Sequence, residues 1–144
     1  MEVYASLIKA KDVIRIKVPY PDLDSKLAKV SHMYICKENQ CDTYACIKCQ
    51  TYRPNIVAQK TVTHYYIEEA DIKRNPFTHK TLIDCDKLFY IRQITLCDEL
   101  KTQRRPDICD ELFTEINNEL NKEGFHDILL DSNKLVQLNQ YIIK

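Results

Sequence analysis

The stretch "SHMYICKENQCDTYACIKCQT", residues 31–51, predicts a β-hairpin in the first half of the chain. Two short apolar runs, "SHMYICKE" and "TYACIKCQT", stand on either side of the polar turn "KENQCD". Apolar runs that are bounded by polar turn residues are typical of neighbouring antiparallel strands. The sequence therefore indicates a protein that is largely β in this region.

A further strand is predicted just before the hairpin, in "KDVIRIKVPY", residues 11–20. Val13, Arg15 and Lys17 alternate there with apolar residues, the period of a half-buried strand. The connection to the hairpin, residues 20–31, has no glycine and is too long for a two-residue turn. Its functional candidates, together with His32, are Tyr20, Asp22, Asp24, Lys26, Lys29 and Ser31. Aromatic and cationic side chains of this kind suit single-stranded RNA, whereas the alternative is a solvated connection of mixed charge.

More β structure is predicted downstream, in residues 60–69 and 80–96. The first segment is "KTVTHYYIEE", and the second, "KTLIDCDKLFYIRQITL", is either a strand pair or one long bent strand. Asp84 and Asp86 interrupt the apolar run of the second segment. Because an unpaired buried carboxylate is costly, both must face solvent or a partner.

The last part of the chain is predicted to be helical. In residues 104–124 the apolar residues Ile108, Leu112, Ile116 and Leu120 recur at helical spacing. Pro106 or Asp107 is expected to start this helix and Gly124 to stop it. A second short helix is predicted in residues 131–144, capped by Asp131 or Ser132. The fold class is thus α+β, mainly β with C-terminal helices, as a single domain (1–144) with a strongly twisted antiparallel sheet or small barrel.

Composition excludes several classes of function. The formal charge is zero, which argues against a protein that coats duplex DNA. A single glycine, Gly124, leaves no glycine-rich loop for a Walker or Rossmann nucleotide site, so no cofactor is expected. No apolar run is long enough to cross a bilayer, and "MEVYASLIKAKDVIRIK" does not resemble a signal peptide. We therefore expect a cytoplasmic protein with no membrane partner.

Seven cysteines raise the question of a metal site. Cys36, Cys41, Cys46 and Cys49 cluster in the sequence, and "CIKC" has zinc-ligand spacing. The alternative, which we favour, is that this pair lies on a strand, where residues three apart point to opposite faces. The histidines His32, His64, His79 and His126 show no metal-binding spacing, so no metal is expected. A cysteine–histidine nucleophilic pair stays open.

The order of the segments resembles the MazF/PemK family of toxin endoribonucleases, which shares its fold with the CcdB gyrase poisons. The first family strand, G-D-I-V-x-V-x-F-P-[FY], is similar to "KDVIRIKVPYPDL" (11–23), and R-P-A-L-V-I-S is similar to "SHMYICK". The third strand of the family ends in a threonine, as "YACIKCQT" does at Thr51. A later family stretch, which contains P-T-H and D-Q-I-R-T-I-D, aligns with residues 62–96. The resemblance covers about residues 10–124 and leaves 125–144 as a helical extension.

The resemblance implies a homodimeric toxin of a type II toxin–antitoxin system that cuts single-stranded RNA without a metal. In the family, the 2′-hydroxyl attacks the adjacent phosphate, and an arginine and a threonine act there. The loop at 20–31 would gate the RNA groove, with Tyr20, Asp22, Lys26 and Ser31 as RNA-binding residues, and the antitoxin would compete for it. Thr51 would contact the scissile phosphate.

This chain departs from the family at the site itself, because Ser31 and His32 replace the arginine and proline. His32 would then act as acid or base, with Lys29 as the positive charge. The alternative is a catalytically inactive binding module on the same scaffold, which binds RNA or a protein partner. Lys11 stands in place of the glycine of the first family strand.

Overall fold

The main sheet is built around β3 (Thr43–Thr51), which is paired along both of its edges. The computed structural model describes residues 8–40, 43–58 and 62–144. Cys41, Asp42 and residues 1–7, the first part of the stretch that does not resemble a signal peptide, lie outside the described residues. β2 (His32–Gln40) runs antiparallel to β3 along one edge, which confirms the predicted hairpin. Along the other edge, β5 (Thr81–Asp84) pairs with the end of β3, and β6 (Lys87–Arg92) pairs with its beginning.

The segment 80–96 is therefore close to the predicted long bent strand. β5 and β6 do not pair with each other but follow one another along the same edge of β3. The remaining strands of this seven-stranded sheet are β1 (Val13–Ile16), β4 (Tyr65–Glu68) and β8 (His126–Leu129). A second sheet holds β7 (Thr95–Leu96) and β9 (Ile142–Ile143).

The predicted mainly β fold with α-helices is confirmed, but two details differ. Between the described strands the pairing path ends at β1 and β4, and no ladder closes the sheet into a barrel. One ladder, between β6 and β8, is parallel. The extension 125–144 was predicted to be helical, yet it contributes β8 and β9 as well as a helix, because its backbone pairs with β6 and β7.

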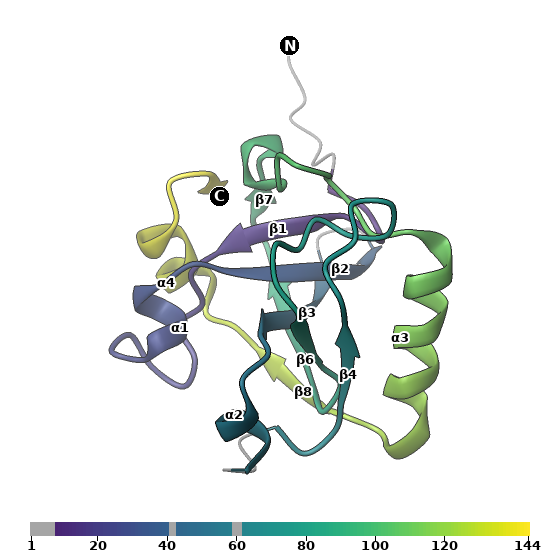
Figure 1. Ribbon diagram of the computed structural model, residues 1–144. Coiled ribbons are helices and arrows are strands. Elements are labelled where there is room, and N and C mark those ends of the chain that lie inside the picture. The colour runs from purple at the N-terminus through teal and green to yellow at the C-terminus, as the bar shows by residue number, and fades with distance from the viewer. Residues whose placement is uncertain (1–7, 41–42, 59–61) are drawn as a thin grey trace.

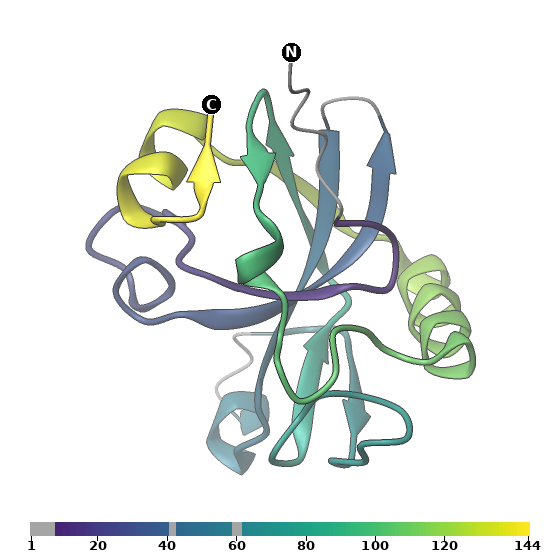
Figure 2. The same cartoon turned by 90° about the horizontal axis from the view of Figure 1, so that it is seen from above.

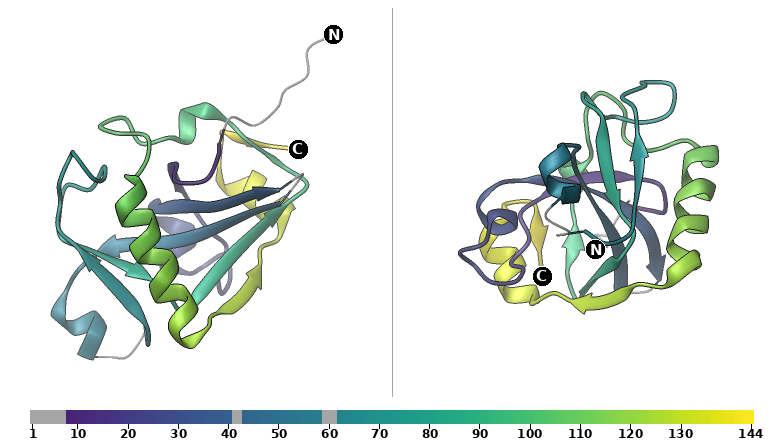
Figure 3. Two further views of the ribbon diagram at one scale, coloured as in Figure 1. Left: turned by 90° about the vertical axis from the view of Figure 1, so that its right-hand side faces the viewer. Right: turned by 60° about the horizontal axis from the view of Figure 1, so that its bottom comes forward.

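Two apolar clusters lie on the two faces of the main sheet, because neighbouring residues of a strand point to opposite sides. One cluster includes Ile14, Tyr34 and Phe89 and packs against Leu135 of α4 (Ser132–Leu138). The other includes residues of β2, β3 and β5 and packs against Leu112, Ile116 and Leu120 of α3 (Asp110–Glu123). Figures 1 and 3 show α3 on one side of the sheet, with α1 (Lys26–Lys29) and α4 at the other. The shorter helices are α2 (Pro54–Ala58) and η1 (Asp98–Leu100).

Two of the predicted helix ends are confirmed and one is wrong. Gly124 ends α3 with a φ of 79°, and the Asp131 side chain caps α4, as predicted. The predicted start of α3 at Pro106 or Asp107 is wrong, because Cys109 is the N-cap residue. The backbone of residues 106–108 forms hydrogen bonds with residues 11–13 instead of starting the helix. Val13 N–H donates to Pro106 O, and Ile108 N–H donates to Lys11 O.

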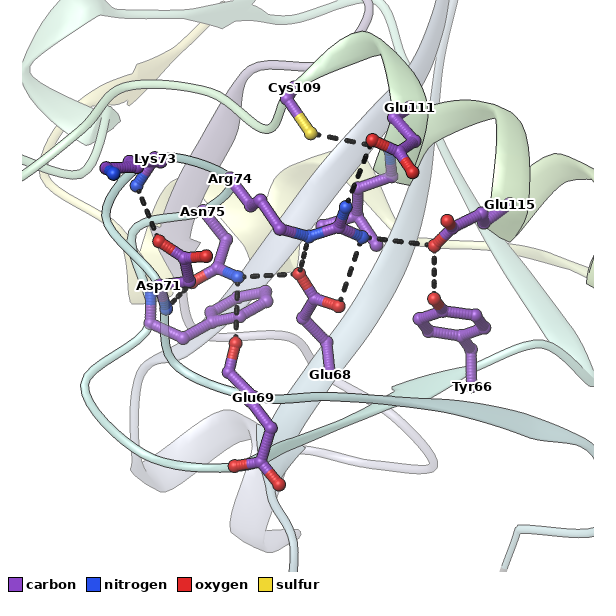
Figure 4. A network of polar contacts seen from close by, with 12 residues as sticks. Tyr66, Glu68, Glu69, Asp71, Lys73, Arg74, Asn75, Cys109, Glu111 and Glu115 are labelled. Atoms are coloured by element: carbon purple, nitrogen blue, oxygen red, sulfur yellow. Dashed lines mark hydrogen bonds and ion pairs between the residues drawn. The ribbon is translucent and has the colours of Figure 1, made fainter.

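Arg74 ties the loop after β4 to α3 (Figure 4). Its Nε lies 2.8 Å from the carboxylate of Glu68, and its Nη2 lies 3.1 Å from that of Glu115. Asn75 Nδ2 also donates to Glu68, at 2.8 Å, and the Tyr66 hydroxyl donates to Glu115. The guanidinium thus neutralises carboxylates from a strand and from a helix, and it fixes the loop that continues into Phe77 and His79.

Arg74→Ala is expected to lower the free energy of unfolding by about 2–4 kcal/mol, because it leaves the buried Glu68 carboxylate without its cation. Urea denaturation of the two proteins measures this difference. Lys80→Ala is the matched control, since Lys80 pairs with Glu69 where both side chains are exposed, and it should cost about 1 kcal/mol or less. Equal effects of the two substitutions would contradict a structural role for the Arg74 network.

Candidate active site

A cavity of about 250 Å³ lies where β1, β2, β3 and β5 meet the loop that follows Asn75. Its lining includes both Ser31 and Thr51, which the sequence analysis had placed in one site. The polar residues that line it are Arg15, Ser31, His32, Gln50, Thr51, Thr78, His79 and Thr81. The cavity is therefore rich in hydroxyl, imidazole and guanidinium groups rather than in carboxylates.

Strand register explains why these side chains meet. Arg15 is opposite Met33, Met33 is opposite Cys49, and these side chains leave the sheet on one face. Two residues further along β3, Thr51 is opposite Thr81 on that same face. Continuing the β2–β3 register by two residues brings Ser31 opposite Thr51. A guanidinium and several hydroxyls thus project from four different segments toward one opening.

His32 was expected to act in one site with Thr51, but the two side chains leave the sheet on opposite faces. It is the register partner of Ile16, so its side chain leaves the sheet on the face opposite to that of Thr51. It still lines the cavity at the start of β2, where its Nδ1 lies 2.9 Å from Val30 O. Burial lowers the pKa of His32, and the positive charges of Lys48, Lys26 and Arg15 add to this, while the Val30 contact opposes it.

Arg15 is the residue that the sequence analysis missed. It was seen only as an alternating position of a half-buried strand. Among the residues that the structure describes, its exposed guanidinium has no carboxylate partner. The signal that locates it is the register between β1 and β2, which no local pattern supplies. Lys29, the predicted cation, lies exposed on α1 and is not among the described residues that line the cavity.

His79 is a second residue whose position was not foreseen, since no pattern in the sequence placed it beside the other candidates. It lies in the loop that Arg74 holds, and its carbonyl oxygen accepts a hydrogen bond of 2.9 Å from Thr81 Oγ1. His79 therefore reaches the cavity from a different segment than His32 does.

Only one of the four predicted RNA-binding loop residues, Ser31, lines the cavity. The ring of Tyr20 packs edge-on against Phe89, with centroids 5.4 Å apart, and belongs to the apolar cluster on the other face. The Asp22 carboxylate accepts from Asp24 N at 2.8 Å, which shapes the turn before α1. Lys26 is exposed on α1. The loop at 20–31 thus reaches the cavity at its end.

Buried charges lie on the face of the sheet to which His32 points. The fully buried Asp84 carboxylate is 2.8 Å from Lys87 Nζ and 3.6 Å from Lys48 Nζ. Asp86 contacts Lys87 at 2.6 Å and accepts from the backbone N–H of Thr63. Burial raises the pKa of Asp84 to about 6, although both lysines oppose this. The prediction that these aspartates face solvent or a partner is confirmed, because both contact a lysine.

The cysteines of the zinc hypothesis are not gathered at one point. "CIKC" lies on β3, as the alternative predicted: Cys46 belongs to one apolar cluster and Cys49 to the other. Cys36 is the cross-strand partner of Cys46, and Cys41 lies outside the described residues. Burial raises the pKa of the Cys36 thiol to about 12. In the described part of the chain, no three His, Cys, Asp or Glu side chains are arranged to hold a metal ion.

Comparison with known proteins found no protein-family model, no curated protein and no solved structure that matches this chain. In the described ranges, none of the helices has both the length and the apolar character needed to span a membrane.

The pKa of His32 is expected to lie below 6.5, which ring-proton NMR titration measures directly. As the pH falls, His32 then takes up a proton in the unfolded chain at a higher pH than in the folded protein. The free energy of unfolding therefore decreases as the pH falls below 6.5. His32→Gln should therefore show a smaller loss of unfolding free energy between neutral and acidic pH than the unsubstituted protein. A His32 titration midpoint at or above 6.5 would contradict the half-buried, cation-flanked position of its ring.

Proposed function

We propose that this protein is a metal-independent endoribonuclease that cuts single-stranded RNA, with its active site at the cavity of Arg15 and Thr51. The observation that carries the proposal is the composition of this cavity. It combines Ser31 and Thr51, the two positions that align with family active-site residues, with an unpaired guanidinium. Arg15 comes from the strand next to the one that holds the arginine in the MazF/PemK family.

A backbone feature also supports the resemblance. Lys11 stands where the first family strand has glycine, and its φ is 79°, a conformation that favours glycine. The mainly antiparallel sheet with α3 on one face is compatible with a divergent sheet of the MazF/PemK type. We extend the proposal to that fold.

The proposed reaction is an internal transfer at phosphorus. The 2′-oxygen forms a bond to the adjacent phosphorus atom, the bond from phosphorus to the 5′-oxygen breaks, and a 2′,3′-cyclic phosphate and a 5′-hydroxyl result. Arg15 offsets the negative charge that develops on the phosphate, and Thr51 donates a hydrogen bond to one of its oxygens. His32 and His79 both line the cavity, and in this proposal one of them accepts the 2′-hydroxyl proton while the other supplies a proton to the leaving oxygen.

The remaining features of the proposal come from the resemblance. The segment 20–31 would cover the bound RNA, since it ends at Ser31 in the cavity wall. An antitoxin would compete with RNA for this site, and two copies of the chain would form a homodimer in the cytoplasm. Each of these is proposed together with the enzyme.

A binding module without cleavage is the second candidate. The observation that favours it is the direction of His32, which points to the face opposite to that of Thr51. Such a module would bind RNA or a protein partner at the same cavity, with Arg15 as its anionic contact. It predicts RNA binding without a cyclic phosphate product.

The deciding experiment is incubation with a long, weakly structured RNA in EDTA, with the cut sites located by primer extension. We expect discrete cuts with 5′-hydroxyl ends. Arg15→Ala should lower the cleavage rate by about 10²-fold or more, and Thr51→Ala by about tenfold or more, because each removes a contact to the developing charge.

Arg92→Ala is the matched control, because Arg92 is an exposed arginine on β6 that does not line the cavity within the described residues. It should cut at the unsubstituted rate. Cuts that persist unchanged in Arg15→Ala and Thr51→Ala would come from a contaminant, and RNA that is bound but stays intact would favour the binding module.

A further inference from the structure

A second cavity, of about 390 Å³, adjoins the first. The two share Arg15, Met33 and Thr78 in their linings, so they form the two lobes of one groove. The second lobe continues past β1 to the segment 99–104 and to Tyr141, near the C-terminus. Figure 2 shows β9 beside β7. The segment that follows β7 crosses β1 close to this pair.

The walls of this second lobe are held by backbone contacts. Thr102 N–H donates to Val13 O at 3.0 Å, which fixes the segment after η1 along β1. Cys97 N–H donates to Tyr141 O, also at 3.0 Å, and β9 pairs with β7 next to it. The side chains of the lobe are therefore presented by fixed strands and not by a free terminus.

The chemistry of the lobe is that of a nucleotide contact. Tyr141 exposes 41% of its surface, which leaves an aromatic ring available for stacking. Arg104 has no carboxylate partner among the described residues, whereas the neighbouring Lys101 is neutralised by Asp98 and Asp12. Stacking on an aromatic ring with a cation on the backbone is the common arrangement for single-stranded nucleic acid.

Among the described residues that line this lobe, Glu99 is the one acidic residue. Its carboxylate repels an acidic peptide and repels a phosphate placed against it. It can accept a hydrogen bond from the amino group of a base such as cytosine. Uracil has no amino group. The charge pattern therefore favours a base near Glu99 and a phosphate near Arg104.

We propose that the second lobe binds the nucleotide next to the one held at Arg15 and Thr51, with its base stacked on Tyr141, its phosphate on Arg104 and its amino group on Glu99. This inference rests on the proposed function, since it assumes that RNA occupies the first lobe. It adds that the substrate is an extended strand and that the second lobe prefers cytosine to uracil.

The test is calorimetric titration with 2′-O-methyl oligonucleotides, which lack the attacking hydroxyl and stay intact. A dinucleotide fills only the first lobe, whereas a hexanucleotide reaches the second. Tyr141→Ala and Arg104→Ala should each weaken hexanucleotide binding about tenfold, because the first removes the stacking ring and the second removes the cation on the phosphate. Both should leave dinucleotide binding unchanged. Tyr141→Phe should retain the affinity, and Arg92→Ala serves as the charge-matched control.

Oligo-C should bind about fivefold more tightly than oligo-U, and Glu99→Gln should remove that preference.

The outcomes separate this inference from the proposed function. If RNA is cut but Tyr141→Ala and Arg104→Ala bind the hexanucleotide like the unsubstituted protein, the second lobe is not a nucleotide site. If the unsubstituted protein neither binds nor cuts RNA, the proposed function is wrong and the inference fails with it. An oligoglutamate peptide that binds more tightly than the hexanucleotide, and depends on Arg104, would assign the lobe to a protein segment and overturn the inference.

Discussion

The pairing of β3 along both of its edges is the constraint on which the rest of the structure depends. β2 fixes one edge, and the bent run of β5 and β6 fixes the other, so β3 cannot shift by one residue without unpairing three strands. Such a shift would also exchange the two faces of the strand. It would move Ile47 and Cys49 out of the cluster under α3, and it would turn Thr51 away from the cavity. Core and site are thus specified by the same register.

The parts of the fold that follow from local chemistry could be predicted from the sequence. Alternating apolar residues located β1, and apolar runs on either side of a polar turn located β2 and β3. Gly124 ended α3 and Asp131 began α4 as expected. The start of α3 was placed too early because the backbone at 106–108 bonds to the strand region, a competition between distant segments. β8 and β9 were missed for the same reason, since each short strand exists only through its partner.

The sequence analysis named some of the residues that line the cavity and missed others. The resemblance placed Ser31 and Thr51 in one site, and the hairpin of β2 and β3 brings them together because they flank it. Arg15 and His79 reach the cavity from a separate strand and a separate loop, and nothing in their own neighbourhoods marks them. Tyr20 shows the converse error: an aromatic residue in a polar loop looked available for stacking, but its ring packs against Phe89 in the core.

The position of Arg15 shows that the phosphate contact of the proposed site does not require an arginine on β2. Stabilising a phosphate in a transition state requires a cation at the right point in space, whichever strand carries it. β1 and β2 are neighbours, and Arg15 projects from the same face as Ser31 and Thr51, so its side chain can serve the same opening. The same guanidinium also lines the second lobe. A cation at this junction acts on both halves of the groove, and an arginine at position 31 would lie in the first half alone.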